Sequence, residues 1–350
     1  MQNIPEELIV EILLRLPVKS LLRFRCVSKS WLSLISNPEF AKMHFQLASN
    51  HTHKLLYIAA SHAKSIDLQA PFYDDSAVAN LNFPFNSPAH NVAIMGSCRG
   101  FLLLKEETNL LLWNPSNGAQ RQVPCTPIVS KTNVAPFLFG FGYDPSTDEY
   151  LVLLGSYDPN ATSLINHFEL FSMKTNTWRI NIMGTEFPYV NPNDEPVAGL
   201  FLNDAIHWLA SRRDEWVGVI LAFDFTKRNL IEVPMPDNVH FAFCDLRLLG
   251  GCLSLSITGI DSVEIWVMKE YGVKPSWTKY IIVSVAEIQT KSFSPICFTN
   301  GGEIVGVDGC SGIVKCNDKG ELVEQRNLCQ EWPECKATIY TETLLGLPSP

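Results

Sequence analysis

Short β-strands recur along most of this chain, and the spacing of their repeat limits what the chain can fold into. In four segments a strand that ends in an aromatic-containing pair is followed by a polar turn and a second strand: "LLLWNPSNGAQRQVP" (110–124), "FELFSMKTNTWRI" (168–180), "LAFDFTKRNLIEVP" (221–234) and "EIWVMKEYGVKPSWTKY" (264–280). Their aromatic residues lie 58, 52 and 43 residues apart, at Trp113, Phe171, Phe223 and Trp266. A period of about 40–50 residues with up to four short strands per unit predicts the blades of a β-propeller.

Five such units fit between residues 92 and 330. Two further strand-like segments, "KLLYIAA" (54–60) and "ATIYTETLL" (337–345), lie at opposite ends of the strand region. In a closed ring we expect these two ends to build a sixth blade jointly, because their pairing removes an exposed sheet edge. A β-sandwich or an open stack of hairpins is the alternative architecture.

The first 48 residues predict helices instead. Pro5 suits the first turn of a helix, Pro17 ends that helix, and "VKSLLRFRCV", "SKSWLSLIS" and "PEFAKMHFQLA" predict three more. Ser28 is placed to cap the third helix, and Asn37 to begin the fourth. The sequence therefore predicts an α+β multidomain chain. It has a small helical module at 1–48, a linker with the first strands of the β domain at 49–91, and an all-β propeller-like domain of about six blades at 92–350.

The first helix has more apolar surface than a small module can bury. Its apolar residues cover roughly 240° of a helical wheel, whereas a surface helix needs a stripe little wider than ~100°; they are Leu8, Ile9, Val10, Ile12, Leu13, Leu14 and Leu16. Glu7, Glu11 and Arg15 form the polar strip, and the last two are spaced to pair. One apolar face packs inward. The other must be covered by the strand domain, by a second copy of the chain or by a different protein.

Composition and charge narrow the functional classes. The chain is 46% hydrophobic and 18% charged, as in folded globular proteins. We expect no membrane span and no secretory signal, since no apolar run approaches roughly 18–20 residues and the N-terminus lacks the signal pattern. Ten cysteines without a CxxC pair suit a reducing compartment, so we expect an intracellular protein of the cytoplasm and/or nucleus. Beyond residue 48 the chain has 21 Lys/Arg and 32 Asp/Glu, a net charge of −11 that argues against nucleic acid as a partner.

Residues 4–45, "IPEELIVEILLRLPVKSLLRFRCVSKSWLSLISNPEFAKMHF", resemble a plant F-box over nearly their whole length. Ile4 stands where that family usually has Leu, and Ser28 stands where Cys is common. The strand region resembles the F-box-associated domain of the same plant families. That likeness rests on the motifs "SCRGFLLL", "LWNPSNGAQRQVP", "FGFGYDPSTDEYLVL", "LNDAIHWLA", "ILAFDFTKRNLIEVP" and "YTETLLGL".

The resemblance implies a substrate-recognition subunit of a Skp–cullin–F-box ubiquitin ligase. In this role the F-box binds a Skp-type adaptor and, through it, a cullin, while the β domain holds a target protein; no catalysis and no cofactor are implied. By family analogy the adaptor-binding residues are Ile4, Pro5, Leu8, Ile9, Ile12, Leu13, Pro17, Val18 and Leu21. The alternative is a propeller enzyme or a glycan-binding propeller whose helical start caps the ring.

We expect target recognition on loops of the β domain, because rigid blades tolerate variable loops. The first candidate is "SRRDEWVG" (211–218), at a position where a tight hairpin needs only two to five residues. It offers Arg212, Arg213 and Trp216, the residue types that interface hot spots favour. The second candidate, "GTEFPYVNPNDEP" (184–196), is a proline-rich crossing between blades that offers Phe187 and Tyr189.

Catalytic and metal-binding patterns are weak. "GSCRG" (96–100) matches a cysteine form of the nucleophile elbow, but such an elbow joins a strand to a helix, and a hairpin pattern follows here. Zinc ligands usually pair two to four residues apart, unlike Cys310, Cys316, Cys329 and Cys335. Within "YDPSTDEY" (143–150) the acidic residues Asp144, Asp148 and Glu149 fit ordinary turn chemistry.

Overall fold

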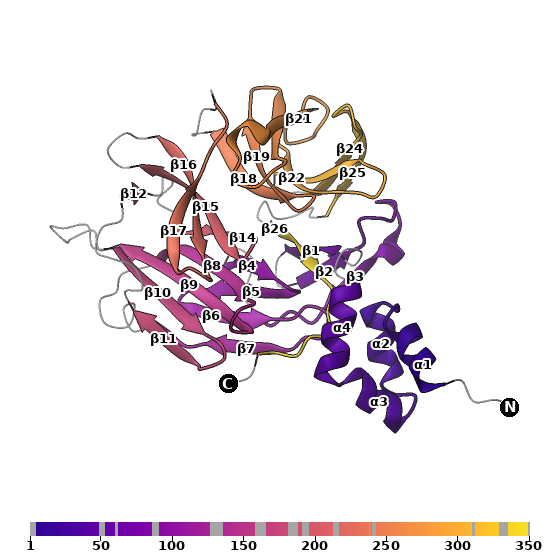
Figure 1. Cartoon of the computed structure of the whole chain (residues 1–350). Coiled ribbons are helices and arrows are strands. Elements are labelled where there is room, and N and C mark those ends of the chain that lie inside the picture. Colours follow the sequence, from indigo (N-terminus) through magenta and orange to yellow (C-terminus); the bar gives the residue numbers. More distant parts are fainter. Residues whose placement is uncertain are drawn as a thin grey trace.

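The computed structural model describes residues 5–48, 53–59, 62–85, 91–126, 136–157, 166–180, 188–190, 196–212, 217–237, 239, 243–309, 312–328 and 335–348. Helices occupy the N-terminal part of the described chain: α1 (Glu6–Leu13), α2 (Val18–Phe24), α3 (Lys29–Ile35) and α4 (Pro38–Ala48). Strands make up nearly all the regular structure that follows, and they form six sheets arranged around a ring (Figure 1). None of the helices in the described ranges combines the length and the apolar character needed to cross a membrane.

Local sequence explains where the helices begin and end. Ser28 caps α3, since its hydroxyl accepts a hydrogen bond from the backbone N–H of Trp31 at 3.1 Å. The side chain of Asn37 accepts a backbone bond in the same way at the start of α4. Both caps were predicted. α1 ends at Leu13, earlier than the predicted stop at Pro17, because Pro17 has no N–H for the Leu13 carbonyl four residues before it and its ring would clash with that carbonyl.

The six sheets are the blades, numbered here from the one that contains the first strand. Blade 1 comprises β26 (Cys335–Thr341), β1 (His53–Ala59), β2 (His62–Ile66) and β3 (Val78–Leu81). Blade 2 comprises β4 (Val92–Cys98), β5 (Phe101–Glu106), β6 (Asn109–Trp113) and β7 (Gln120–Val123). Blade 3 comprises β8 (Pro136–Asp144), β9 (Glu149–Tyr157), β10 (Asn166–Ser172) and β11 (Thr177–Ile180).

The remaining blades follow in chain order. Blade 4 comprises β12 (Tyr189–Val190), β14 (Leu200–Leu202), β15 (Ala205–Arg212), β16 (Gly218–Asp224) and β17 (Asn229–Val233). Blade 5 comprises β18 (Cys244–Leu249), β19 (Cys252–Thr258), β20 (Ser262–Met268) and β21 (Trp277–Ser284). Blade 6 comprises β22 (Ser294–Phe298), β23 (Ile304–Asp308), β24 (Gly312–Cys316) and β25 (Leu322–Asn327). All four predicted strand–turn–strand segments are present, each as the last two strands of its blade.

The two ends of the strand region close the ring in blade 1, as predicted. β1 pairs antiparallel with β26, from His53 opposite Thr341 to Ala59 opposite Cys335. Neighbouring blades then contact one another around the whole ring: β26 with β4, β4 with β8, β8 with β14, β15 with β18, β18 with β22, and β22 with β26. This closed order excludes the alternatives of a β-sandwich and an open stack of hairpins.

Blade 4 departs from the simple four-strand plan at its inner edge. A short strand between β12 and β14, β13 (Val197–Ala198), leaves blade 4 and pairs parallel with β8 of blade 3. Gly199 follows it and donates its backbone N–H to the carbonyl of Phe139 at 2.7 Å, while the Trp208 indole donates to the same carbonyl at 2.9 Å. A side chain at Gly199 would clash with Ile206, so glycine is required where the two blades approach this closely.

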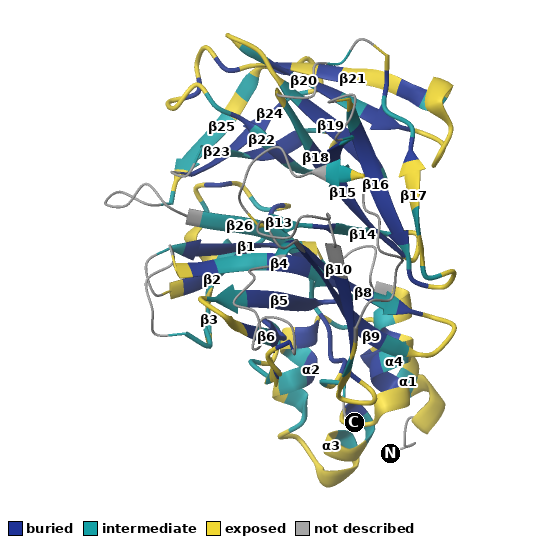
Figure 2. Ribbon diagram, turned by 90° about the vertical axis from the view of Figure 1, so that its left-hand side faces the viewer, coloured by how far each residue is buried: buried dark blue, intermediate teal, exposed yellow. Residues whose placement is uncertain are grey.

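The largest hydrophobic core extends from the helical module into the ring. It joins buried leucines of α1 and α2 to residues of blades 2 and 3, and the C-terminal Leu344 and Leu345 belong to the same cluster. In Figure 2 the strands are mostly buried, whereas exposed residues gather on the turns and on the outer sides of the helices. The helical module is thus packed on the ring rather than attached to it only by a linker.

Candidate functional site

α1 has two apolar sides that face different surroundings. Leu13 is 1% exposed and packs in the module's core with Ile35 and Phe40. On another side of the same helix, Leu8 and Ile12 lie one turn apart and are 54% and 55% exposed. The strand domain therefore leaves part of the predicted apolar excess uncovered.

The nine residues predicted to bind an adaptor fall into three groups. Four are exposed and one is half-buried: Pro5, Leu8, Ile12 and Pro17, with Ile9. Three are buried and form the core of the module: Leu13, Val18 and Leu21. The structure shows these three packed in the module's core, and adaptor contact by them stays a prediction. Ile4 lies outside the described residues, and adaptor contact by the exposed residues stays a prediction.

Further apolar side chains of the module are exposed, and sequence reasoning missed them. They are Val27, Leu32, Met43 and Leu47. A helical wheel drawn for α3 and α4, as for α1, is the signal that could have found three of them. Val27 lies in the turn between α2 and α3, where helical periodicity carries no information.

The turn between β4 and β5 connects the helical module with blade 3. Arg99 has left-handed backbone (φ 49°), and its guanidinium lies 5.2 Å from the centre of the Phe45 ring of α4 and 3.9 Å from that of Tyr143. The Tyr143 hydroxyl donates to Asp148, whose carboxylate also lies 3.6 Å from Lys42 of α4. The hydrogen bond from Tyr143 is the main reason that the pKa of Asp148 is lowered. The SCRG motif is therefore an interdomain contact.

Cys98 in the same motif is an unsuitable nucleophile in this fold. Its side chain is buried, and burial raises the pKa of the thiol. β4 leads through Arg99 and Gly100 directly into β5, so the predicted hairpin is confirmed and the strand-to-helix junction of a nucleophile elbow is not formed at this position.

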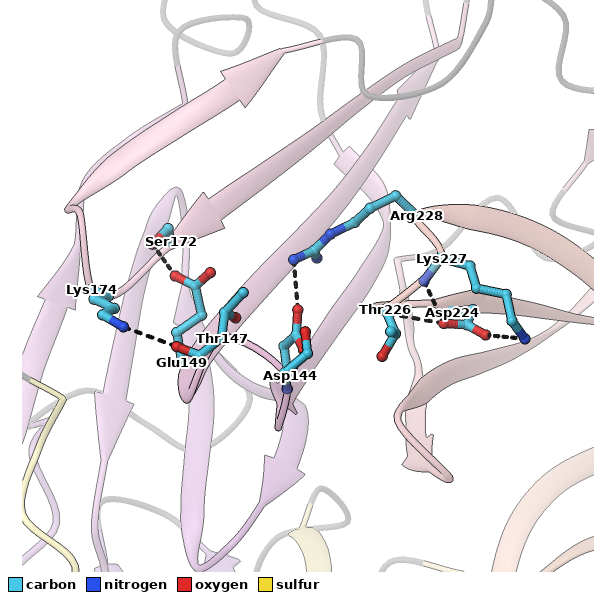
Figure 3. A network of polar contacts seen from close by, with 10 residues as sticks. Asp144, Thr147, Glu149, Ser172, Lys174, Asp224, Thr226, Lys227 and Arg228 are labelled. Carbon is cyan, nitrogen blue, oxygen red and sulfur yellow. Dashed lines mark hydrogen bonds and ion pairs between the residues drawn. The ribbon is translucent and has the colours of Figure 1, made fainter.

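A second polar network joins blade 3 to blade 4, where the β8–β9 turn meets the β16–β17 turn (Figure 3). The carboxylate of Asp144, 1% exposed, lies 2.8 Å from Arg228 and accepts the backbone N–H of Ser146 at 2.9 Å. Glu149 in the same turn accepts a hydrogen bond from Ser172. The acidic turn that the sequence indicated is thus confirmed, but its link to the next blade could not be predicted because Arg228 is 84 residues away.

Two of the predicted target-binding residues meet at one carboxylate. β12 pairs with the end of β15, which sets Tyr189 opposite Arg212. The Tyr189 hydroxyl donates to Glu232 at 2.8 Å, and Arg212 Nε donates to the same carboxylate at 2.9 Å. The hydrogen bond from Arg212 lowers the pKa of Glu232, and burial is the main cause that raises the pKa of Tyr189 to about 12. The two candidate segments, 184–196 and 211–218, therefore adjoin.

Strand pairing makes the first candidate loop shorter than expected. Ser211 pairs with Gly218, and the backbone N–H of Arg212 donates to the Val217 carbonyl at 2.9 Å. The connection proper is therefore 213–217, within the usual length of a hairpin loop. Three predicted target-binding residues lie outside the described residues: Phe187, Arg213 and Trp216.

Comparison with known proteins identifies both parts of the chain. Residues 1–43 match the F-box domain, and residues 34–323 match the F-box associated beta propeller domain. The chain belongs to the F-box proteins with an F-box-associated propeller. This confirms the resemblance seen in the sequence, and the combination implies a substrate-receptor role in a Skp–cullin–F-box ubiquitin ligase.

Relatives of this F-box protein occur in Arabidopsis thaliana. The chain is 28% identical over 297 residues to an F-box/kelch-repeat protein, an alignment that covers 80% of this chain and 79% of that protein. It is 29% identical over 320 residues to F-box protein CPR1, which covers 84% and 76%. A chain in the crystal structure of a nidogen/laminin complex matches with a TM-score of 0.52 and 12% identity, over 83% of this chain and 99% of that chain. That likeness shows the propeller fold alone.

A metal site needs several ligand side chains grouped together. Within the described ranges, no three or more His, Cys, Asp or Glu residues are grouped so that they could hold a metal ion. Of the four cysteines with regular spacing, Cys310 and Cys329 lie outside those ranges.

Proposed function

We propose that the F-box binds a Skp-type adaptor through the exposed side of α1, while the propeller binds a target protein. The chain is then a non-catalytic subunit that links its target through the adaptor to a cullin, in the cytoplasm and/or nucleus. The exposure of Leu8 and Ile12 carries this proposal, because both lie on a helix whose other side is already anchored in the core by Leu13.

The small exposed area of Leu8 and Ile12 shows that other F-box residues must also contribute to adaptor binding. Burying one Leu or Ile completely contributes roughly 1.5–3 kcal/mol. Leu8 and Ile12 are each about half exposed, so covering both contributes only about 2 kcal/mol. A micromolar complex needs about 8 kcal/mol. Adaptor binding must therefore also use neighbouring exposed residues, of which Pro5 and Pro17 flank α1 directly.

The direction of the strands favours a target surface away from the F-box. The β16–β17 turn contacts the β8–β9 turn through Arg228 and Asp144, and the β8–β9 turn contacts α4 through Asp148. β15 begins at Ala205 beside the β16–β17 turn and ends at Arg212, roughly 23 Å further on for eight strand residues. The pair Tyr189 and Arg212 thus lies at the far end of blade 4.

An exposed apolar residue of blade 5 also favours a target-binding surface on the side of the ring away from the F-box. In blades 4 and 5 the outermost strands are β17 and β21, and the β15–β16 and β19–β20 turns each join the two strands before them. The two turns therefore lie on the same side of the ring, away from the F-box. Ile260 in the β19–β20 turn is 93% exposed. A target bound on this side leaves the F-box free to hold its adaptor.

Co-purification with a Skp-type adaptor tests the first half of the proposal. Leu8→Asp and Ile12→Asp each place a charge that must be desolvated in the complex, so we expect at least about a tenfold loss of bound adaptor. Ile260→Asp is the matched control, since it adds the same charge at an exposed apolar position on the propeller. Adaptor binding that is as strong in both F-box variants as in the control contradicts the proposal.

A further inference from the structure

Beyond β26 the chain continues as a C-terminal tail, residues 342–348, that lies along the β6–β7 turn (Figure 1). Asn114, which is buried at the start of that turn, donates from Nδ2 to the carbonyl of Thr343 at 3.4 Å and to that of Leu345 at 3.2 Å. The backbone N–H of Thr343 donates to the hydroxyl of Ser116 at 3.0 Å. Blade 2 therefore holds the tail by its backbone, at a position outside the strand pairing that closes the ring.

The side chains of the tail belong to the core that the F-box shares with the propeller. Leu344 and Leu345 are buried in that cluster, and Leu347 packs against it. The same cluster contains the F-box core residues Leu13 and Leu21. Burial raises the pKa of the Glu342 carboxyl at the start of the tail. One short segment thus contacts a core common to both domains.

Gly100 shows how closely the tail passes the β4–β5 turn. Its backbone is left-handed (φ 86°), and a side chain there would clash with Thr343 and with the carbonyl of Thr341. The preceding residue, Arg99, contacts Phe45 of α4. The tail, the β4–β5 turn and the last part of α4 consequently meet in one place.

We propose that this tail is an interdomain clamp, which fixes the orientation of the F-box relative to the propeller and so positions a bound target for ubiquitin transfer. The positioning role rests on the function proposed above; the clamp itself does not. A fixed orientation matters because transfer to a lysine depends on holding the reacting groups in one geometry.

The tail is suited to this role because the ion pair described above between α4 and the β8–β9 turn is weak on its own. The Lys42–Asp148 ion pair lies at the surface, where such pairs contribute little. The tail instead buries two leucines and satisfies backbone groups, which are the stronger kinds of contact.

Three variants of the full chain test the clamp. Deletion of 342–350 removes the tail but keeps β26 to its last residue, and deletion of 349–350 is the matched control. Asn114→Asp keeps the oxygen that accepts the Ser116 backbone N–H and replaces the donor to the tail with a second oxygen. Hydrogen exchange is measured in α4 and, as a check on the propeller, in β19 of blade 5. Ubiquitin on the protein's own lysines is mapped in a ligase reconstituted with adaptor, cullin and the upstream enzymes.

If the clamp exists, exchange in α4 rises at least about tenfold on deletion of 342–350 and by a smaller factor in Asn114→Asp, with β19 unchanged. Adaptor binding persists, and ubiquitin spreads to lysines that the control leaves unmodified. Equal exchange in α4 and an equal lysine pattern in all three variants overturn the inference. If deletion of 342–350 also raises hydrogen exchange in β19, that deletion has disturbed the propeller, and the exchange in α4 of Asn114→Asp decides whether the clamp exists. Failure of the unaltered chain to bind the adaptor refutes the proposed function, and the exchange measurement still decides the clamp.

Discussion

The guanidinium of Arg99 lies 5.2 Å from the centre of the Phe45 ring. Arg99 belongs to the β4–β5 turn of the propeller and Phe45 to α4 of the F-box, so this pair connects the two domains directly. The guanidinium also lies 3.9 Å from the ring centre of Tyr143 in blade 3. One cation thus lies between an aromatic ring of each domain, a contact that contributes about 0.5–2 kcal/mol.

Replacing Arg99 should weaken the contact between the F-box and the propeller without unfolding blade 2. Arg99→Asn keeps a residue that tolerates left-handed backbone and removes the cation, so we expect faster hydrogen exchange in α4 and a loss of about 1 kcal/mol in the free energy of unfolding. Glu107→Asn is the control, because Glu107 is exposed and has similar backbone (φ 52°) in the β5–β6 turn. Equal exchange in α4 for the two variants contradicts the assigned role.

The Arg228–Asp144 pair between blades 3 and 4 should contribute more to the free energy of unfolding than the exposed Lys227–Asp224 pair beside it. Arg228→Met leaves the buried carboxylate of Asp144 without its cation, which we expect to lower the free energy of unfolding by about 3 kcal/mol. Lys227→Met in the same turn breaks the surface pair with Asp224 and should change the free energy of unfolding by less than about 1 kcal/mol. Urea unfolding measures both. A double-mutant cycle with Asp144→Asn then isolates the pairwise energy, and a coupling near zero rules the pair out as a link between blades.

A buried histidine predicts how stability changes with pH. The Nδ1–H of His207 donates to the carbonyl of Leu200 at 3.2 Å, and Nε2 accepts from the Tyr271 hydroxyl at 2.7 Å. Burial lowers the pKa of His207 from 6.5 to about 4. Between these two values the unfolded chain binds a proton that the native chain does not bind. Stability is therefore full above pH 6.5 and is lost as the pH falls toward about 4, by roughly 3 kcal/mol in all.

The variant His207→Gln tests this assignment, because glutamine cannot titrate. We expect the unaltered chain to lose at least about 2 kcal/mol more than the variant between pH 7 and pH 4.5. The comparison is the slope of the unfolding free energy against pH, measured in urea at each pH. Parallel slopes for the two proteins mean that His207 does not titrate as described.

The target surface is tested in the Ile12→Asp variant, which we expect to hold a target but not to bind the adaptor. Proteins that co-purify with Ile12→Asp define the captured set, and replacing 213–216 with Gly-Ser-Gly-Ser in that background should release them. We expect the melting temperature to change by less than about 2 °C, because no strand residue is replaced. Swapping the turn 299–303 of blade 6, on the F-box side, is the control. If capture survives both the 213–216 swap and Tyr189→Ala, the recognition surface lies elsewhere.

Much of the fold could be predicted because it depends on neighbours in the chain. The caps at Ser28 and Asn37 follow from side chains that bond backbone groups two or three residues away. The recurring hairpins follow from strand patterns separated by turn residues. Closure of the ring by 54–60 and 337–345 followed from unpaired strands at both ends, since a lone edge strand is unfavourable.

The candidate sites could be predicted only in part. The sequence indicated that α1 has surplus apolar surface, but packing decided that Leu13 is inside and that Leu8 and Ile12 are outside. It offered Tyr189 and Arg212 as residues of two separate segments, and the pairing of β12 with β15 brought them to the same carboxylate. Periodicity shows which residues share a face of an element, but it does not show which element covers that face.

By itself, then, the sequence determined the four helices, the strand hairpins and the joining of the two chain ends, because propensity, capping and turn chemistry act over a few residues and an edge strand must find a partner. The tertiary structure alone decided that Arg99 meets Phe45, that Asp144 pairs with Arg228 and that the tail inserts beside Asn114. The partners in these contacts are separated by 54, 84 and 231 residues, a distance over which only the packed ring can bring their side chains together.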